Sequence, residues 1–286
     1  MRLSRIVSAG LLAIGLAACS SAGRPDLSGM SFSEDPLVGK VVWYDLITED
    51  STESRRFYNG LFGWTFEETT GVEGNPYILA RSGGVYVGGM VPVAARADGN
   101  PISRWLPYMS VEDVDAAIIR TDAWGGQVAA AARDVEVGRV AAIIDPQGAV
   151  IGLARSDIGD PDDKTTAAAP GRAIWTELLA DDDVAAAAFY ASVVGFETSR
   201  IERRGGEYTL LSNGGMHRAG ILQNPTDWQP AWLTHFAVAD PSAAAARAEQ
   251  LGGRVLLPPT QDVREGTVAI VSDPSGAILA LQKWPL

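Results

Sequence analysis

Hydrophobic residues recur along this chain in a fixed order of strand-like and helix-like patterns. Residues 41–47 are rich in β-branched and aromatic side chains, which is typical of a strand, and residues 51–61 place apolar side chains on one helical face. Three more strand-like runs follow, and the order then starts again near residue 106. The pattern predicts helices at 51–61 and 113–124, and strands at 41–47, 63–69, 77–82, 84–92, 106–111, 126–136, 139–145 and 149–154.

Capping and turn residues mark the ends of these elements. Asp50 precedes the first helix and Glu53 follows three residues later, which predicts an N-cap with its capping-box partner. Gly63 predicts the end of that helix. The Gly83–Gly84 pair and the run at 145–148, Asp-Pro-Gln-Gly, predict the tight turns of two hairpins.

The second half of the chain repeats the first at an offset of roughly 130 residues. Matched pairs include Trp43 with Trp175, Phe57 with Phe189, Gly63 with Gly195, and Asp145 with Asp273. The repeat predicts further helices near 182–193 and 240–251. We therefore predict an α+β protein of two tandem domains. Each domain is expected to be a pair of βαβββ units, with curved mixed sheets that form a cup and helices outside.

The N-terminal residues have the features of a targeting segment. Arg2 and Arg5 precede an apolar run at 6–16, which is shorter than the roughly 20 residues that span a bilayer. Leu-Ala-Ala-Cys at 16–19 resembles a bacterial lipobox and predicts lipid attachment at Cys19, the only cysteine. An ordinary secretory signal that happens to contain a cysteine is the alternative. We expect a cell-envelope lipoprotein, held by its lipid anchor at the outer membrane and facing the periplasm.

Composition completes the predicted domain layout. Residues rich in Ser, Gly, Pro and Asp surround the repeats and are typical of flexible connections. The predicted layout is a signal peptide at 1–18, a tether at 19–38, a first domain at 39–155, a linker at 156–170 and a second domain at 171–286. The two domains are expected to pack on each other.

The charge balance excludes one class of partner. The chain has 35 acidic and 23 basic residues, and it contains no run of Lys and Arg. A basic patch is the usual mark of a nucleic-acid-binding protein, so we expect no nucleic-acid partner. A single cysteine also excludes an intrachain disulfide and a Cys-rich metal site.

Several short motifs, each present in order, resemble one known superfamily. They are Phe57-Tyr58, the Leu-Phe-Gly-Trp run at 61–64, Val-Glu-Asp at 111–113, and Asp-Pro-x-Gly at 145–148. Together, and with their repeats in the second domain, they resemble the vicinal oxygen chelate superfamily of glyoxalases, bleomycin-resistance proteins and extradiol dioxygenases. Its metal-using members carry ligands on the first, fourth, fifth and eighth strands.

Neither domain of this chain has metal ligands at the positions that the resemblance implies. These positions are Trp43, 87–89, Leu106 and Gly152 in the first domain, and Trp175, Ala219, Leu233 and Ala280 in the second. Divalent metals need His nitrogen, carboxylate oxygen or comparable donors. We therefore expect no metal and no cofactor, and the metal-dependent activities are not carried over.

Other polar residues are predicted to face the cups. Asp45 and Glu177 lie two residues after the matched tryptophans, and Tyr108 and His235 occupy equivalent positions on the fifth strands. Glu177 and His235 are candidate catalytic residues, because a carboxylate and a histidine can act as general base and acid. A carboxylate and a histidine that serve only to hold the structure together are the alternative for this pair.

An aromatic floor suits the binding of a flat or cationic molecule. The predicted ligand-binding residues are Trp43, Asp45, Tyr108, Trp175 and His217. Core packing is the alternative for the two tryptophans, and an exposed turn is the alternative for His217. Because both histidines of the chain lie in the second domain, we expect that domain to hold the working site.

Three functions remain open on these observations. The favoured one is a membrane-anchored, glyoxalase/bleomycin-resistance-like protein that binds a small aromatic or cationic molecule without metal. The second is an enzyme (a lyase, isomerase or dioxygenase) that uses Glu177 and His235 without metal or has a non-standard metal site. The third is a structural or partner-binding lipoprotein.

Overall fold

The computed structural model describes residues 31–71, 74–97, 102–163, 169–203, 206–225 and 228–284. The predicted signal peptide, Cys19 and most of the predicted tether lie outside these residues. No helix in the described ranges combines the length and the apolar composition needed to cross a membrane.

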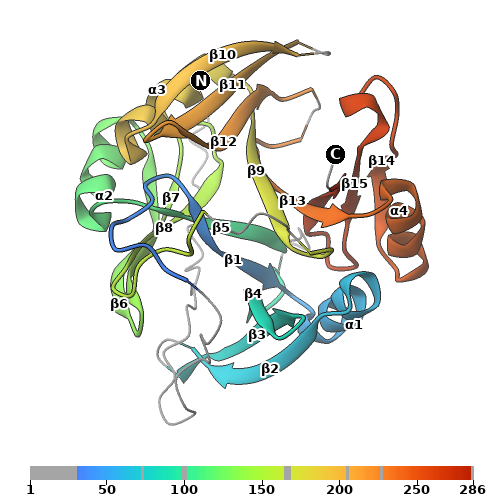
Figure 1. Cartoon of the computed structure of the whole chain (residues 1–286). Helices are drawn as coiled ribbons and strands as arrows, with labels where there is room; N and C mark the ends of the chain where they lie inside the picture. Colours follow the sequence, from blue (N-terminus) through green and yellow to red (C-terminus); the bar gives the residue numbers. More distant parts are fainter. Residues whose placement is uncertain are drawn as a thin grey trace, which may run out of the picture.

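Each half of the chain forms one eight-stranded sheet (Figure 1). The strands of the first are β1 (Val41–Thr48), β2 (Thr65–Thr70), β3 (Pro76–Ser82), β4 (Val85–Pro92), β5 (Arg104–Ser110), β6 (Gln127–Val135), β7 (Gly138–Ile144) and β8 (Val150–Ser156). Those of the second are β9 (Ala173–Ala180), β10 (Glu197–Arg203), β11 (Gly206–Asn213), β12 (Met216–Gln223), β13 (Ala231–Val238), β14 (Arg254–Leu257), β15 (Val268–Ser272) and β16 (Ile278–Lys283). The helices are α1 (Ser51–Phe62), α2 (Val114–Ala123), α3 (Asp183–Val194) and α4 (Pro241–Gln250).

The order of strands confirms the predicted fold class. The first sheet runs β2-β3-β4-β1-β5-β8-β7-β6, and the second runs β10-β11-β12-β9-β13-β16-β15-β14. In each, two βαβββ units meet through an antiparallel central pair, β1 with β5 and β9 with β13. Parallel pairs, such as β1 with β4 and β13 with β16, close each unit and make the sheets mixed.

Local signals at the first helix explain its start and end. The Asp50 carboxylate accepts hydrogen bonds from the backbone N–H groups of Thr52 and Glu53, as an N-cap should. The predicted capping box is wrong in its second half, because the Glu53 carboxylate accepts hydrogen bonds from Arg56, one turn further along, at 2.5 and 3.0 Å. Gly63 ends the helix in the left-handed conformation, with φ of 71°.

The hydrophobic core runs across the boundary between the two sheets. One cluster joins α2 and its sheet to α3, and another joins α1 to α4. Figure 1 shows these helix pairs on opposite flanks of the molecule. Two equivalent buried hydrogen bonds also connect the domains. The Tyr58 hydroxyl donates to Asp273 at 3.3 Å, and the Tyr190 hydroxyl donates to Asp145 at 3.0 Å. The two domains therefore pack on each other in a pseudo-symmetric way.

Candidate functional site

The two candidate catalytic residues meet inside the second domain. Alternation along β9 puts Trp175 and Glu177 on one face, and β13 places His235 opposite Trp175 in the pairing register. The Glu177 Oε1 and His235 Nε2 atoms are 3.0 Å apart. Both residues are almost fully buried, with 4% and 1% of their surface exposed.

Two residues that the sequence analysis missed complete the environment of Glu177. The Tyr208 hydroxyl donates to Glu177 Oε2 at 2.9 Å and accepts a hydrogen bond from the Trp175 indole at 2.8 Å. The Arg264 guanidinium donates to the same Glu177 oxygen. Both oxygens of this buried carboxylate therefore have partners supplied by the chain itself.

The surroundings of His235 fix its charge. Its Nε2 faces the Glu177 carboxylate, and its Nδ1 lies 2.8 Å from Gln282 Oε1. The same Gln282 oxygen accepts a hydrogen bond from Arg264 at 3.3 Å, so the amide oxygen, and not its NH₂ group, faces His235. A histidine with an acceptor at each nitrogen donates from both, so His235 is a cationic imidazolium here.

These partners set the charge of Glu177. Burial alone would raise the pKa of Glu177, but the neighbouring His235 and Arg264 cations and the Tyr208 hydrogen bond outweigh burial and lower it to about 2. A general base works best with a pKa near the operating pH, so a carboxylate this acidic is a weak base at neutral pH. Glu177 and His235 lie together as predicted, but their environment favours a structural role for the pair over a catalytic one.

A strained turn positions Arg264. Arg264 and Glu265, between β14 and β15, have φ of 46° and 56° and are the non-glycine residues with positive φ in the described part of the chain. Such conformations cost about 1 kcal/mol or more each and persist where the surroundings enforce them. The Thr267 hydroxyl donates to the Arg264 carbonyl at 2.6 Å, and the guanidinium reaches Glu177 and Gln282. These contacts hold the turn in place.

The first domain contains a simpler version of the same cluster. The Tyr77 hydroxyl donates to Asp45 Oδ1 at 2.6 Å, and the Trp43 indole nitrogen lies 3.0 Å from that oxygen. Tyr108 occupies the position of His235, and among the described residues no cation binds the Asp45 carboxylate directly. Burial raises the pKa of Asp45 to about 7, because hydrogen bonds from neutral groups such as Tyr77 offset only part of the desolvation.

Two glycines make room for the tyrosines in both clusters. Side chains at Gly89 on β4 and Gly220 on β12 would collide with the hydroxyls of Tyr77 and Tyr208. In the metal-using members of the superfamily that the sequence resembles, these strands carry a metal ligand. Here the missing side chain lets a hydroxyl reach the carboxylate instead.

Some buried polar atoms of the first domain have no hydrogen-bond partner among the described residues. They are Asp45 Oδ2, the Tyr108 hydroxyl and Arg133 Nη2. Tyr108 and Arg133 both lie close enough to lower the pKa of Asp45. The carboxylate of Asp45 is thus less completely hydrogen-bonded than that of Glu177, both of whose oxygens have partners.

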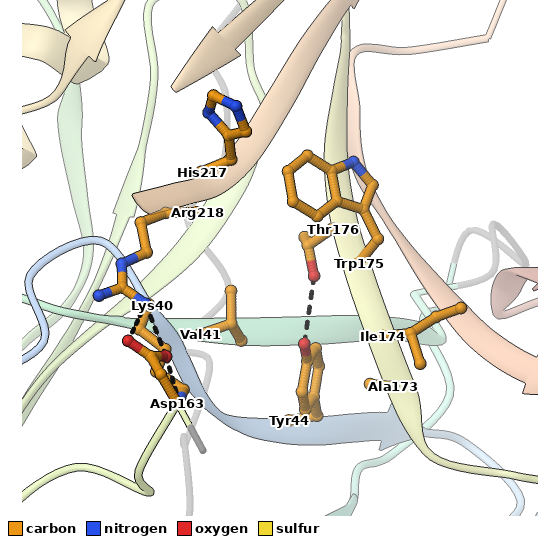
Figure 2. Close-up of a pocket in the computed structure, with 10 residues that line it drawn as sticks. All are labelled: Lys40, Val41, Tyr44, Asp163, Ala173, Ile174, Trp175, Thr176, His217 and Arg218. Atoms are coloured by element: carbon orange, nitrogen blue, oxygen red, sulfur yellow. Dashed lines mark hydrogen bonds and ion pairs between the residues drawn. The ribbon is translucent and has the colours of Figure 1, made fainter. Parts of the chain in front are cut away.

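A pocket of about 220 Å³ lies where the two domains meet (Figure 2). Trp175 and His217 line it from the second domain, and Tyr44 lines it from the first. The Tyr44 hydroxyl lies 3.3 Å from the Thr176 hydroxyl at its base, and His217 Nδ1 lies 2.9 Å from the Ser212 hydroxyl. The exposed His217 is therefore a pocket residue and does not join the buried Glu177 cluster.

The predicted ligand-binding residues thus fall in two places. Trp175 and His217 line the pocket, whereas Trp43, Asp45 and Tyr108 lie together in the first cup. Lys40, Asp163 and Arg218, which the sequence analysis did not single out, form one side of the pocket.

The residues in the cups do not fit a divalent metal ion. No group of three or more His, Cys, Asp and Glu side chains suited to a metal occurs in the part of the chain that the structure describes. In the second cup, the Arg264 guanidinium already lies against the Glu177 carboxylate, beside the His235 imidazolium. A further cation there would face two positive groups, which makes this position unsuited to a metal ion.

Comparisons with known proteins agree with the observed architecture. The family model "Glyoxalase/Bleomycin resistance protein/Dioxygenase superfamily" matches residues 40–153 and 172–281. A putative glyoxylase, CFP32, of Mycobacterium bovis is 36% identical over 251 residues, which cover 86% of this chain and 95% of that protein. The anthracycline biosynthesis protein DauV of a Streptomyces species is 30% identical over 256 residues, or 84% of this chain and 91% of the relative.

Solved structures share the fold at low identity. A Mn(II)-bound glyoxalase from Novosphingobium aromaticivorans has a TM-score of 0.58 at 17% identity, covering 86% of this chain and 82% of that one. The 2,3-dioxygenase LapB from Pseudomonas sp. KL28 has a TM-score of 0.55 at 14% identity, covering 86% and 92%. At identities this low, the two structures show that the fold is shared and give no information about the site.

Proposed function

The chain belongs to the Glyoxalase/Bleomycin resistance protein/Dioxygenase superfamily, and from that premise we propose that it binds a small planar molecule without a metal. The proposed site is the pocket between the domains in Figure 2. The observation that carries the proposal is the presence of Trp175 and His217, two side chains suited to a flat ligand, in the lining of that pocket.

Trp175 is held in a fixed orientation. Its indole N–H donates to Tyr208, whose hydroxyl is bound to Glu177, and Glu177 is held in turn by His235 and Arg264. A wall that is rigid before binding loses little conformational entropy when a ligand stacks on it. The buried charge cluster thus supports the binding surface.

The size of the pocket limits the ligand. Pockets for drug-sized molecules are roughly 300–1,000 Å³. A pocket of about 220 Å³ suits a molecule with a single ring.

Binding is favoured over turnover by the state of the candidate catalytic pair. Glu177 and His235 are not among the residues that line the pocket, and Glu177 is a poor base with a pKa of about 2. Relatives named for glyoxylase function and anthracycline biosynthesis support a role that involves a small molecule.

Matched tryptophan variants test the proposal. A panel of single-ring compounds would be screened by thermal shift, and hits would be measured by calorimetry on Trp175→Ala and Trp43→Ala proteins. We expect Trp175→Ala to weaken binding at least about tenfold, because the stacking surface is lost. Trp43→Ala should bind normally. Binding that survives Trp175→Ala but fails in Trp43→Ala would move the site to the first cup. Elemental analysis of the purified protein that finds stoichiometric metal would contradict the metal-free proposal.

We also propose that Cys19 carries a lipid that holds the protein at the outer membrane, facing the periplasm. The lipobox-like sequence supports it. Cys19→Ser should release the protein into the soluble fraction or leave it unprocessed. A processed Cys19→Ser protein that still sediments with membranes would contradict the anchor.

A further inference from the structure

We infer that the pocket between the domains recognises an anionic group, so that its ligand is a small aromatic acid with the carboxylate at Arg218. The inference rests on the proposed binding of a planar molecule at Trp175. It goes further, because it selects among an acid, a neutral compound and a cation. The cationic ligand expected from the sequence is the one it disfavours.

Arg218 in the pocket has unused hydrogen-bonding capacity, which is the first argument. Its side chain is 8% exposed, and its Nη1 contacts both oxygens of Asp163 at 2.8 and 2.9 Å. Its Nε is buried and has no hydrogen-bond partner among the described residues. A guanidinium normally binds a carboxylate through two parallel N–H groups, so concentrating the Asp163 contacts on Nη1 leaves the edge with Nε unused.

The charge of the pocket is the second argument. Lys40 and Arg218 are cationic and Asp163 is anionic, so the charged lining sums to one positive charge. Burial alone would raise the pKa of Asp163, but Arg218 and Lys40 outweigh burial and lower it, so Asp163 stays ionised at neutral pH. This local excess of positive charge occurs in a protein with a formal net charge of −12. An anion placed here gains a local attraction that a cation does not.

The arrangement of the lining is the third argument. Figure 2 shows the Trp175 ring on one side, the group of Lys40, Asp163 and Arg218 on the other, and Tyr44 at the base. A single-ring acid can place its ring against Trp175 and its carboxylate toward Arg218. Val87 occupies the position of Arg218 in the first domain, so the repeat does not provide a second such site.

Three compounds that share one ring separate the alternatives. Benzoate, benzamide and benzylamine are anionic, neutral and cationic at neutral pH, and each would be titrated into the full chain by calorimetry. We expect benzoate to bind at least about tenfold more tightly than benzamide, which is the gain typical of one good charge-assisted hydrogen-bond pair. Benzylamine should bind most weakly.

Variants of the pocket sharpen the test. Arg218→Met should remove the preference for benzoate while binding of benzamide persists, and Arg200→Met, which alters an exposed arginine of the same domain, should change neither. Asp163→Asn keeps the shape and removes one negative charge, so benzoate affinity should rise by about threefold or more. This gain also distinguishes a binding effect from a folding defect.

The outcomes separate this inference from the proposal beneath it. Equal affinity for benzoate and benzamide, with both lost in Trp175→Ala, would support the pocket as the binding site and contradict the recognition of an anion. Absence of binding by all three compounds would contradict both.

Discussion

The two cups hold the same three-residue arrangement and treat its carboxylate in opposite ways. Asp45 and Glu177 each accept a hydrogen bond from a tyrosine that is linked to a tryptophan. Glu177 also faces Arg264 and His235, and its pKa falls to about 2, whereas Asp45 has mainly neutral donors and its pKa rises to about 7. The difference teaches that the neighbouring elements, not the strand that bears the carboxylate, decide its charge.

The extra methylene of Glu177 explains part of this divergence. Both carboxylates start from the same strand position, but the longer side chain reaches partners on three other segments, β11, β13 and the turn before β15. Asp45 leaves Oδ2 without a partner in the described part of the chain. The longer side chain therefore lets Glu177 reach the cations that the neighbouring segments supply, whereas Asp45 keeps mainly neutral donors.

Neutralising each carboxylate should have the largest and most unequal effects. Glu177→Gln leaves the buried His235 and the half-buried Arg264 without their anion, and breaking a buried ion pair in this way costs about 3–5 kcal/mol. Asp45→Asn replaces a carboxyl that is already half protonated near pH 7, so we expect a loss of under about 1 kcal/mol. Urea unfolding at pH 7 measures both. Equal losses would contradict the difference between the cups.

The pH dependence of stability should differ in sign between the two sites. The pKa of Asp45 is raised by folding, so its folded state holds the proton more tightly and stability falls as pH rises from about 4 to 7. The pKa of Glu177 is lowered by folding, so its stabilisation is present above about pH 4.5 and is lost as pH falls toward 2.

Asp45→Asn isolates the first of these effects. Between pH 5 and 8, the wild type should lose up to about 3 kcal/mol relative to this variant. Thermal unfolding at several pH values measures the difference. A wild type that gains stability relative to Asp45→Asn over this range would show that Asp45 is ionised and paired.

Removing the tyrosine hydroxyls should have a smaller effect than neutralising Glu177. Tyr208→Phe removes a hydrogen bond to an ionised carboxylate, which is worth about 1.5–3 kcal/mol, and Tyr77→Phe removes one to a largely neutral acid, worth about 1 kcal/mol. Urea unfolding at pH 6, where Asp45 is mostly protonated, gives the comparison. A larger loss from Tyr77→Phe would reverse the assignment of charge.

Much of the fold and part of the site could be predicted from sequence. The repeat and the turn signals predict two copies of one domain, and alternation along β9 and β13 predicts that Glu177 and His235 face each other. Tyr77 and Tyr208 recur at an offset of 131 residues, one less than the 132 that separates the tryptophans, so the repeat contained the information to find them.

Other features lay beyond the sequence signals. Arg264 belongs to a strained turn, so neither the repeat nor a periodic pattern identifies it. His217 lines the pocket and does not join the Glu177 cluster; the pairing of β11 with β12 shifts register between Leu211 and Ser212, so alternation along β12 does not predict where His217 lies. The pocket joins Lys40, Asp163 and Arg218 from three parts of the chain, and only the packing of the domains brings them together.

A crystal structure of the protein soaked with benzoate tests the central claim most directly. The account predicts one molecule in the pocket between the domains, with its ring against Trp175 and its carboxylate at Arg218. A molecule bound instead in the first cup, beside Trp43, Tyr108 and Arg133, would contradict it.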